Sequence, residues 1–224
     1  MQAAQRGQID VVDFLLCMGG NVSQVDNYGR NVLHWACTGG HVSMVKYLLS
    51  QGSVDINGRA RGRVTPLMIA TMTGHGDVVE LLVCMGANVS HVDDHHNNVL
   101  HYASTSGHAK IVKYIVSKDT VDVNSRGRFG RTPLMLAANA GRITVFDQLM
   151  WKGGLTRLVD DNGYNILHLA SLGGRVEMVK HILSQNLVDI NARNKDGETA
   201  AMIAKLKRKR HVYYVLVSRG CPVK

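Results

Sequence analysis

The sequence contains few prolines and few aromatic residues. It has 3 prolines among 224 residues, and aromatic side chains make up 5% of the chain. Scarce proline fits a chain rich in helices, because proline removes a backbone donor and disrupts a helix interior. Scarce aromatics argue against one large core built from rings. Hydrophobic residues still account for 45% of the chain, which is enough for a sizeable buried core.

Signals for membrane insertion and secretion are also missing. No run of about 20 apolar residues occurs, so we expect no membrane span. The first residues, MQAAQRGQIDVVDFLL, predict a helix and lack the long apolar stretch and cleavage site of a signal peptide. We therefore expect a cytoplasmic protein, with the nucleus as the alternative compartment.

Cysteine pairs and catalytic motifs are absent as well. The four cysteines (Cys17, Cys37, Cys84 and Cys221) form no C-x-x-C pair, so we expect buried free thiols and not disulfides. No Gly-x-Ser-x-Gly, phosphate-binding glycine loop or His-Glu-x-x-His motif is present. The carboxylates are spread along the chain. We therefore expect no enzymatic activity and no cofactor.

What the sequence does contain is a repeat. Short signatures begin at residues 31, 65, 98, 132, 165 and 199, so the spacing alternates between 34 and 33 residues. Three of them are Asn-Val-Leu-His or Asn-Ile-Leu-His, and three are Thr-Pro-Leu-Met or Thr-Ala-Ala-Met. Asn and Thr both cap helix N-termini. Each signature is followed by a glycine-terminated helix, a second amphipathic helix and a polar loop.

This pattern resembles the ankyrin repeat, which has a period of about 33 residues and a T-P-L-H-x-A signature. The resemblance implies an all-α fold, a solenoid of stacked helix-turn-helix units joined by β-hairpin loops. It also implies that His34, His101 and His168 bond within their turns and link neighbouring units. The sequence departs from the family at Met68, Met135 and Met202, where histidine is usual.

The spacing predicts a single domain over residues 1–224. We expect the chain to be a segment of a longer protein, because it begins inside a first helix. The predicted units are a partial repeat at 1–25, full repeats at 26–59, 60–92, 93–126, 127–159 and 160–193, and a C-terminal capping repeat at 194–224.

The loop tips carry the strongest signs of recognition. Tips before the Thr-type signatures are rich in arginine, and tips before the Asn-type signatures are acidic or mixed. Arginine forms bidentate bonds with carboxylates, and exposed aromatics anchor interfaces. We therefore expect a scaffold that binds another protein, through an acidic or extended segment, at its tips and concave face. The candidate partner-binding residues are Tyr28, Arg30, Arg59, Arg61, Arg63, His95, His96, Arg126, Arg128, Phe129, Arg131 and Tyr164.

Two alternatives to this function stay open. The net charge of +9 and the run Lys-Leu-Lys-Arg-Lys-Arg-His at 205–211 suit a nuclear or nucleic-acid-associated adaptor. Acidic tips on the same edge would repel phosphates, so nucleic acid is not the expected partner. The other alternative is a structural spacer within a larger protein. In isolation we expect a monomer.

Two further sets of residues stand out in the loops. The resemblance implies that Asn57, Asn124 and Asn191, in Val-Asp-Ile-Asn or Val-Asp-Val-Asn, match substrates of the oxygen-sensing asparaginyl hydroxylase, although asparagine also suits the turn. The tip at 91–96 gathers histidines and aspartates, but their spacing matches no zinc site. We expect a solvated tip or a partner contact there, and no metal.

Overall fold

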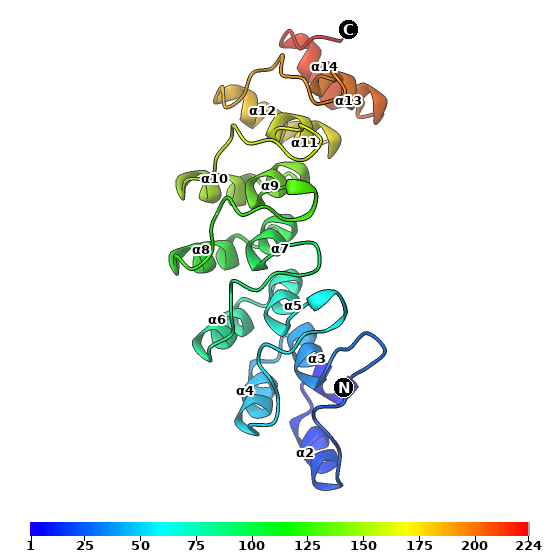
Figure 1. The fold of residues 1–224 in the computed structure, drawn as a ribbon, viewed down its shortest axis with the longest axis vertical. Helices are drawn as coiled ribbons and strands as arrows, with labels where there is room; N and C mark the ends of the chain where they lie inside the picture. The colour runs from blue at the N-terminus through cyan, green and yellow to red at the C-terminus, as the bar shows by residue number, and fades with distance from the viewer. Residues whose placement is uncertain (224) are drawn as a thin grey trace. The chain divides into compact units, whose positions relative to one another are not determined.

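The computed structural model describes residues 1–223, which fold into short helices (Figure 1). The first compact unit covers residues 1–102, and the second begins at Ala103. No β-strand occurs among residues 1–223, so the predicted all-α class is confirmed. The first unit holds α1 (Gln2–Gln5), α2 (Ile9–Cys17), α3 (Val32–Gly39), α4 (Val42–Ser50), η1 (Arg61–Arg63), α5 (Pro66–Thr73) and α6 (Gly76–Cys84).

Helix α7 (Val99–Ser106) begins in the first unit and ends in the second. The second unit continues with α8 (Ala109–Ser117), η2 (Arg128–Gly130), α9 (Pro133–Ala140), α10 (Ile143–Trp151), α11 (Ile166–Leu172), α12 (Val176–Ser184), α13 (Ala200–Leu206) and α14 (Arg210–Ser218). Most helices thus form pairs, in which a helix opened by a signature is followed by an amphipathic one.

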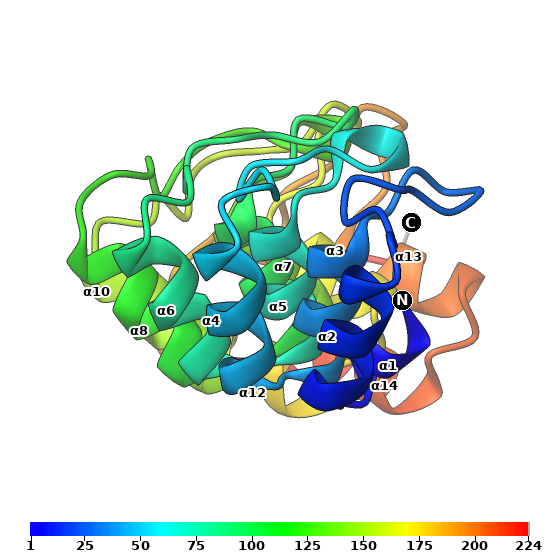
Figure 2. The same cartoon turned by 90° about the horizontal axis from the view of Figure 1, so that it is seen from below.

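Within each unit, like helices pack on like. In the first unit α3 packs on α1 and α5, and α4 packs on α6. In the second, α11 packs on α9 and α13, while α10 packs on α8 and α14 on α12. The loops of each unit run along one edge of its helices (Figure 2). Within each unit, this arrangement places the loop tips of successive repeats next to one another.

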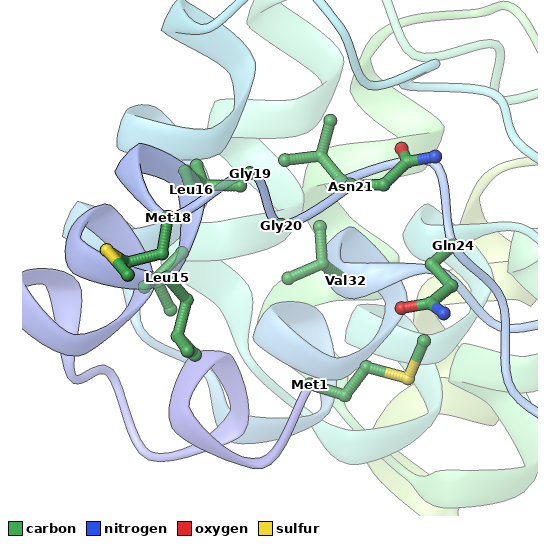
Figure 3. Close-up of a pocket in the computed structure, with 11 residues that line it drawn as sticks. Met1, Leu15, Leu16, Met18, Gly19, Gly20, Asn21, Gln24 and Val32 are labelled. Atoms are coloured by element: carbon green, nitrogen blue, oxygen red, sulfur yellow. The ribbon is translucent and has the colours of Figure 1, made fainter.

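One apolar position of the second helix is buried in α4 and α6 but not in α2. Leu48 in α4 and Leu82 in α6 are fully buried, whereas Leu15 at the equivalent place in α2 is 50% exposed. No helix pair covers the outer side of α2 in the described chain. A cavity of about 420 Å³ opens there, lined by Met1, Leu15, Val32 and their neighbours (Figure 3).

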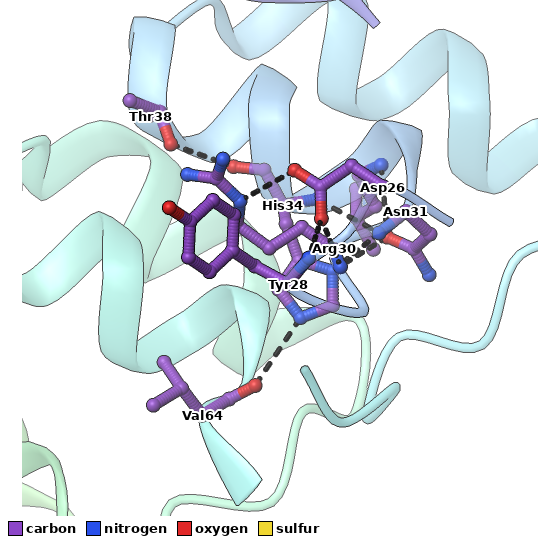
Figure 4. Close-up of polar contacts among 8 residues, drawn as sticks. Asp26, Tyr28, Arg30, Asn31, His34, Thr38 and Val64 are labelled. Atoms are coloured by element: carbon purple, nitrogen blue, oxygen red, sulfur yellow. Dashed lines mark hydrogen bonds and ion pairs between the residues drawn. The ribbon is translucent and has the colours of Figure 1, made fainter. Parts of the chain in front are cut away.

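Asparagine caps the Asn-type helices, and histidine supports it. The Asn31 side chain accepts hydrogen bonds from the backbone N–H groups of Leu33 and His34 at 3.1 and 3.2 Å. The Val64 carbonyl, 3.2 Å from Nε2 of His34, can only accept, so Nε2 carries the hydrogen (Figure 4). Burial lowers the pKa of His34. The neutral ring therefore links its own repeat to the next one, as the resemblance implied.

Methionine takes part of this role in Thr-type helices. Thr132 caps α9, and the sulfur of Met135 accepts from the Thr132 backbone N–H at 3.5 Å. Thr199 and Met202 repeat the arrangement at α13, with a sulfur distance of 3.4 Å. The thioether thus satisfies the cap N–H, but it has no second polar atom to reach the next repeat.

Two further expectations concern membrane insertion and the cysteines. No helix among residues 1–223 combines the length and the apolar character that a membrane span requires. None of the four cysteines forms a disulfide, but the expectation that they are buried is wrong for Cys17 and Cys84. These two residues end α2 and α6, and both are exposed.

Candidate functional site

Each acidic tip is built around its first aspartate. Oδ1 of Asp26 accepts from the backbone N–H groups of Tyr28 and Arg30 at 2.8 and 2.9 Å. Asp93 and Asp160 make the same turn-closing bonds in their own loops. These two carboxylates are only 4% and 3% exposed, so they cannot project towards a partner. In these two tips the first aspartate is therefore withdrawn from the surface, whereas the second, Asp94 or Asp161, is exposed.

Neighbouring tips are tied together by single backbone hydrogen bonds. In the first unit the Arg61 N–H donates to the Tyr28 carbonyl at 2.7 Å, and the Asp94 N–H donates to the Gly62 carbonyl at 2.9 Å. In the second unit the Asp161 N–H donates to the Phe129 carbonyl at 2.9 Å. These bonds fix the register of the tips, and so the spacing of the side chains that the tips carry.

The first basic tip presents uncommitted cations. The side chains of Arg59, Arg61 and Arg63 are exposed and make no hydrogen bond or ion pair within the described chain. Two of these charges act on a neighbouring histidine. Burial lowers the pKa of His91, and the positive charges of Arg59 and Arg63 lower it further. Arg63 sits at φ 60°, so the tip turns in the left-handed region. Tyr28 and the exposed His95 and His96 lie on the tips joined to this one; Tyr28 is 58% exposed.

Arg30, by contrast, is committed to its own loop. Its Nε lies 2.8 Å from Oδ2 of Asp26 (Figure 4). Its guanidinium sits 4.1 Å from the centre of the Trp35 ring. The Tyr28 ring covers the same group at 5.1 Å. Arg30 therefore holds Tyr28 in place, and we assign it a positioning role within the predicted site.

The second basic tip uses its arginines for bracing. Nη1 of Arg126 donates to the carbonyls of Gly130 and Val159, both at 3.0 Å. Arg131 pairs with the buried Asp160 at 3.0 Å. Arg128 and Arg131 flank the ring of Phe129 at 4.8 and 5.4 Å. This tip therefore presents a half-exposed phenyl ring between ordered cations.

Most of the remaining predicted residues make contacts within the fold. Tyr164 is partly buried, and its ring stacks on His168 with centroids 5.9 Å apart. Oδ1 of Asn124 accepts from the Leu155 N–H at 2.9 Å, and its Nδ2 donates to the Gly153 carbonyl at 3.0 Å. In the first unit Asn57 accepts from the Asn88 N–H at 2.8 Å. Asn191 is the exposed member of the three asparagines matched to hydroxylase substrates.

Two further features concern metal ligands and an exposed tryptophan. Among residues 1–223, no three His, Cys, Asp or Glu side chains come close enough together to hold a metal ion. Trp151, at the end of α10, is 83% exposed and was not among the predicted site residues. Aligning the second helices would have singled it out, because the other repeats have serine or cysteine at this position.

Known proteins resemble this chain along nearly its whole length. Residues 1–93, 86–155 and 134–224 match the family described as "Ankyrin repeats (3 copies)". Palmitoyltransferase AKR1 of Lachancea kluyveri is 30% identical over 77% of this chain and 24% of that protein. "Probable E3 ubiquitin-protein ligase XBOS32" of Oryza sativa subsp. japonica is 31% identical over 91% of this chain and 40% of that protein. The chain thus spans less than half of either relative. The human ASB11 ankyrin repeat domain superposes with a TM-score of 0.83 at 28% identity, covering 98% of this chain and 96% of that one.

Proposed function

We propose, since this chain belongs to the ankyrin-repeat family, that it is a protein-binding scaffold whose first unit captures an acidic, extended segment of a partner. Ankyrin repeats generally mediate protein–protein interaction. The observation that carries the finer proposal is the tip at 59–63, where three exposed guanidinium groups have no carboxylate of their own. A partner carboxylate would find bidentate donors there without breaking an existing ion pair.

The neighbouring tips suit an extended ligand. The backbone bonds between tips hold Tyr28, the arginine tip and the His95–His96 tip in a row. A peptide lying along this row meets an aromatic anchor, then cations, then imidazoles. Tyrosine and arginine are the residues that most often supply interface hot spots. The turn-closing role of Asp26 and Asp93 commits these two carboxylates to their own loops, and Asp94 stays exposed on this row.

The relatives favour binding over catalysis for this part of the chain. One is named a palmitoyltransferase and another a ubiquitin ligase, and each shares with this chain only a repeat-bearing fraction of its length. A segment shared by proteins with such different names is better suited to binding partner proteins than to one chemical reaction. We propose that the repeats themselves are not catalytic and that they act in the cytoplasm or nucleus.

Charge reversal at the tip tests this proposal. We expect the triple variant Arg59→Glu, Arg61→Glu, Arg63→Glu to lose binding of a labelled oligoglutamate peptide at physiological salt. The matched control reverses Lys46, Lys110 and Lys205, which are exposed on helices and change the net charge equally. The control should keep most of the binding. Equal loss in both variants would mean that net charge, and not the tip, attracts the peptide.

A second candidate function rests on the turn between α13 and α14. Lys205 at the end of α13, and Lys207 and Arg208 in the turn, are all exposed, as a nucleic-acid contact requires. Labelled duplex DNA should then bind with an affinity that falls steeply as salt rises, and the Lys205 control variant should weaken it. If the protein binds DNA and ignores oligoglutamate, the adaptor function replaces the scaffold proposed here. Binding of neither probe would favour the spacer.

A further inference from the structure

Trp151 differs from the residues at the equivalent position of the other repeats. It is the last residue of α10, and it exposes 83% of its surface. An indole in water offers a large apolar area to a partner, and tryptophan is strongly enriched in interface hot spots. The equivalent final residues of the other second helices are all small: Cys17, Ser50, Cys84, Ser117, Ser184 and Ser218. The repeat fold therefore does not require tryptophan at this position.

A groove adjoins this tryptophan on the surface of α8 and α10. Its volume is about 740 Å³, and it lies entirely within the second unit. Val116 of α8 lines it together with Gln148 and Trp151 of α10, while Lys113 and Lys152 also border it. The groove thus combines an apolar lining with cations, on second helices and not on the loop tips.

The charged residues that line the groove are two lysines, Lys113 and Lys152, and one aspartate, Asp147. Asp147 lies 2.7 Å from Nε2 of His181, and Asp119 lies 3.3 Å from Nζ of Lys152. Lys113 is exposed and has no ion pair within the described chain. A carboxylate-bearing ligand would therefore gain a partner at Lys113 without competing with an existing one.

Gln148 supplies a second indication of a ligand. Its Oε1 atom is buried and has no hydrogen-bond partner within residues 1–223. A buried acceptor without a donor is costly, because it has lost its hydrogen bonds to water without gaining a replacement. A peptide in the groove could bring a backbone N–H to this oxygen, whereas an acyl chain could not.

We propose that this groove is a second docking site, which binds an acidic peptide segment of another protein that places a large apolar side chain against Trp151. Lys113 faces its carboxylate, Gln148 accepts from its backbone, and Val116 and Trp151 contact the apolar anchor. A second copy of this chain fits less well, because the chain carries a net charge of +9. The site is independent of the arginine tip of the first unit.

Tryptophan fluorescence gives a direct test. The chain has 2 tryptophans, so Trp35→Phe leaves Trp151 as the only indole and keeps a ring beside Arg30. The probe is a short synthetic peptide with one leucine flanked by glutamates. Two control peptides replace the leucine by alanine or the glutamates by lysine. We expect the probe alone to shift the Trp151 emission to shorter wavelength, because docking removes the indole from water.

Variants then locate the site. With a fluorescently labelled probe, Trp151→Ser should weaken binding at least about tenfold, and Lys113→Glu should weaken it several-fold. Trp151→Ser installs the residue that other repeats carry, so circular dichroism should be unchanged. A protein with Arg61→Glu should still give the emission shift, which separates this site from the tip.

Several results would overturn the proposal. One is an emission spectrum that the probe leaves unchanged at millimolar concentration. Another is an equal shift with the lysine peptide. A shift caused by phosphatidylserine vesicles, in the absence of any response to the peptide, would assign the surface to membranes. A shift that grows with protein concentration alone would assign it to self-association.

Discussion

The side chain of Asn124 should stabilise the second unit by joining two successive loops. Its amide accepts from the Leu155 N–H and donates to the Gly153 carbonyl, at 2.9 and 3.0 Å. Asn191 occupies the same place one repeat pair later, and its backbone N–H bonds to Asp189 as that of Asn124 bonds to Asp122. Replacing each by alanine keeps this backbone bond, so the comparison isolates the side-chain amide.

The expected loss of stability depends on which backbone groups each variant leaves without their hydrogen-bond partner. Asn124→Ala removes two hydrogen bonds, and each contributes a net stabilisation of about 0.5–1.5 kcal/mol. Gly153 is exposed, so water can replace one bond, whereas Leu155 is partly buried. We therefore expect a loss of about 1–2 kcal/mol for Asn124→Ala. Asn191 is exposed and its alanine variant should cost about 0.5 kcal/mol or less.

Urea unfolding followed by circular dichroism measures the difference between the two variants. Because the chain has two compact units, amide exchange at Leu155 provides the local readout that a global unfolding curve does not. Exchange there should accelerate in Asn124→Ala and stay slow in Asn124→Asp, which keeps an acceptor for this N–H. Equal stability of the two alanine variants, or unchanged exchange at Leu155, would refute the proposed role of the amide.

Three further predictions rest on other contacts of the fold. Burial lowers the pKa of His34 and His168 from the usual 6.5, so the unfolded chain takes up protons first and stability should fall as the pH drops below that value. Replacing both by methionine, as the Thr-type repeats do, should flatten the dependence of the melting temperature on pH. Leu48→Ala should cost about 2–5 kcal/mol in urea unfolding, and Leu15→Ala, at the half-exposed equivalent place, much less. Arg131→Ala should cost about 2 kcal/mol because it removes the cation beside buried Asp160, whereas Arg61→Ala should stay within about 0.5 kcal/mol.

The helices and their order could be predicted because their signals are local. Asn31 and Thr65 lie within three residues of the N–H groups that they cap. Gly40 and Gly74 end their helices in the left-handed region, at φ 75° and 84°. A short stretch of sequence therefore contains both partners of each interaction, and the repeat multiplies the signal.

The availability of the arginines could not be predicted, because it depends on residues about 30 positions away. Arg126 is braced by the carbonyl of Val159, and Arg131 by Asp160 in the following loop. The matching tip of the first unit has Arg59 where the second has Arg126, and Val64 where the second has Arg131.

The aspartate in the loop that follows each basic tip, Asp93 in the first unit and Asp160 in the second, also differs in its contacts. Oδ2 of Asp93 accepts from the Tyr102 hydroxyl at 2.6 Å and from the Asn97 amide at 3.1 Å. Burial raises the pKa of Asp93, but these bonds lower it overall, so the carboxylate stays ionised without an arginine. A tyrosine one helix turn into α7 thus supplies the hydrogen bond that Arg131 supplies to Asp160. The first tip therefore needs no arginine to pair with its aspartate, and its three arginines make no ion pair within the described chain, so two tips of similar composition differ in what they can bind.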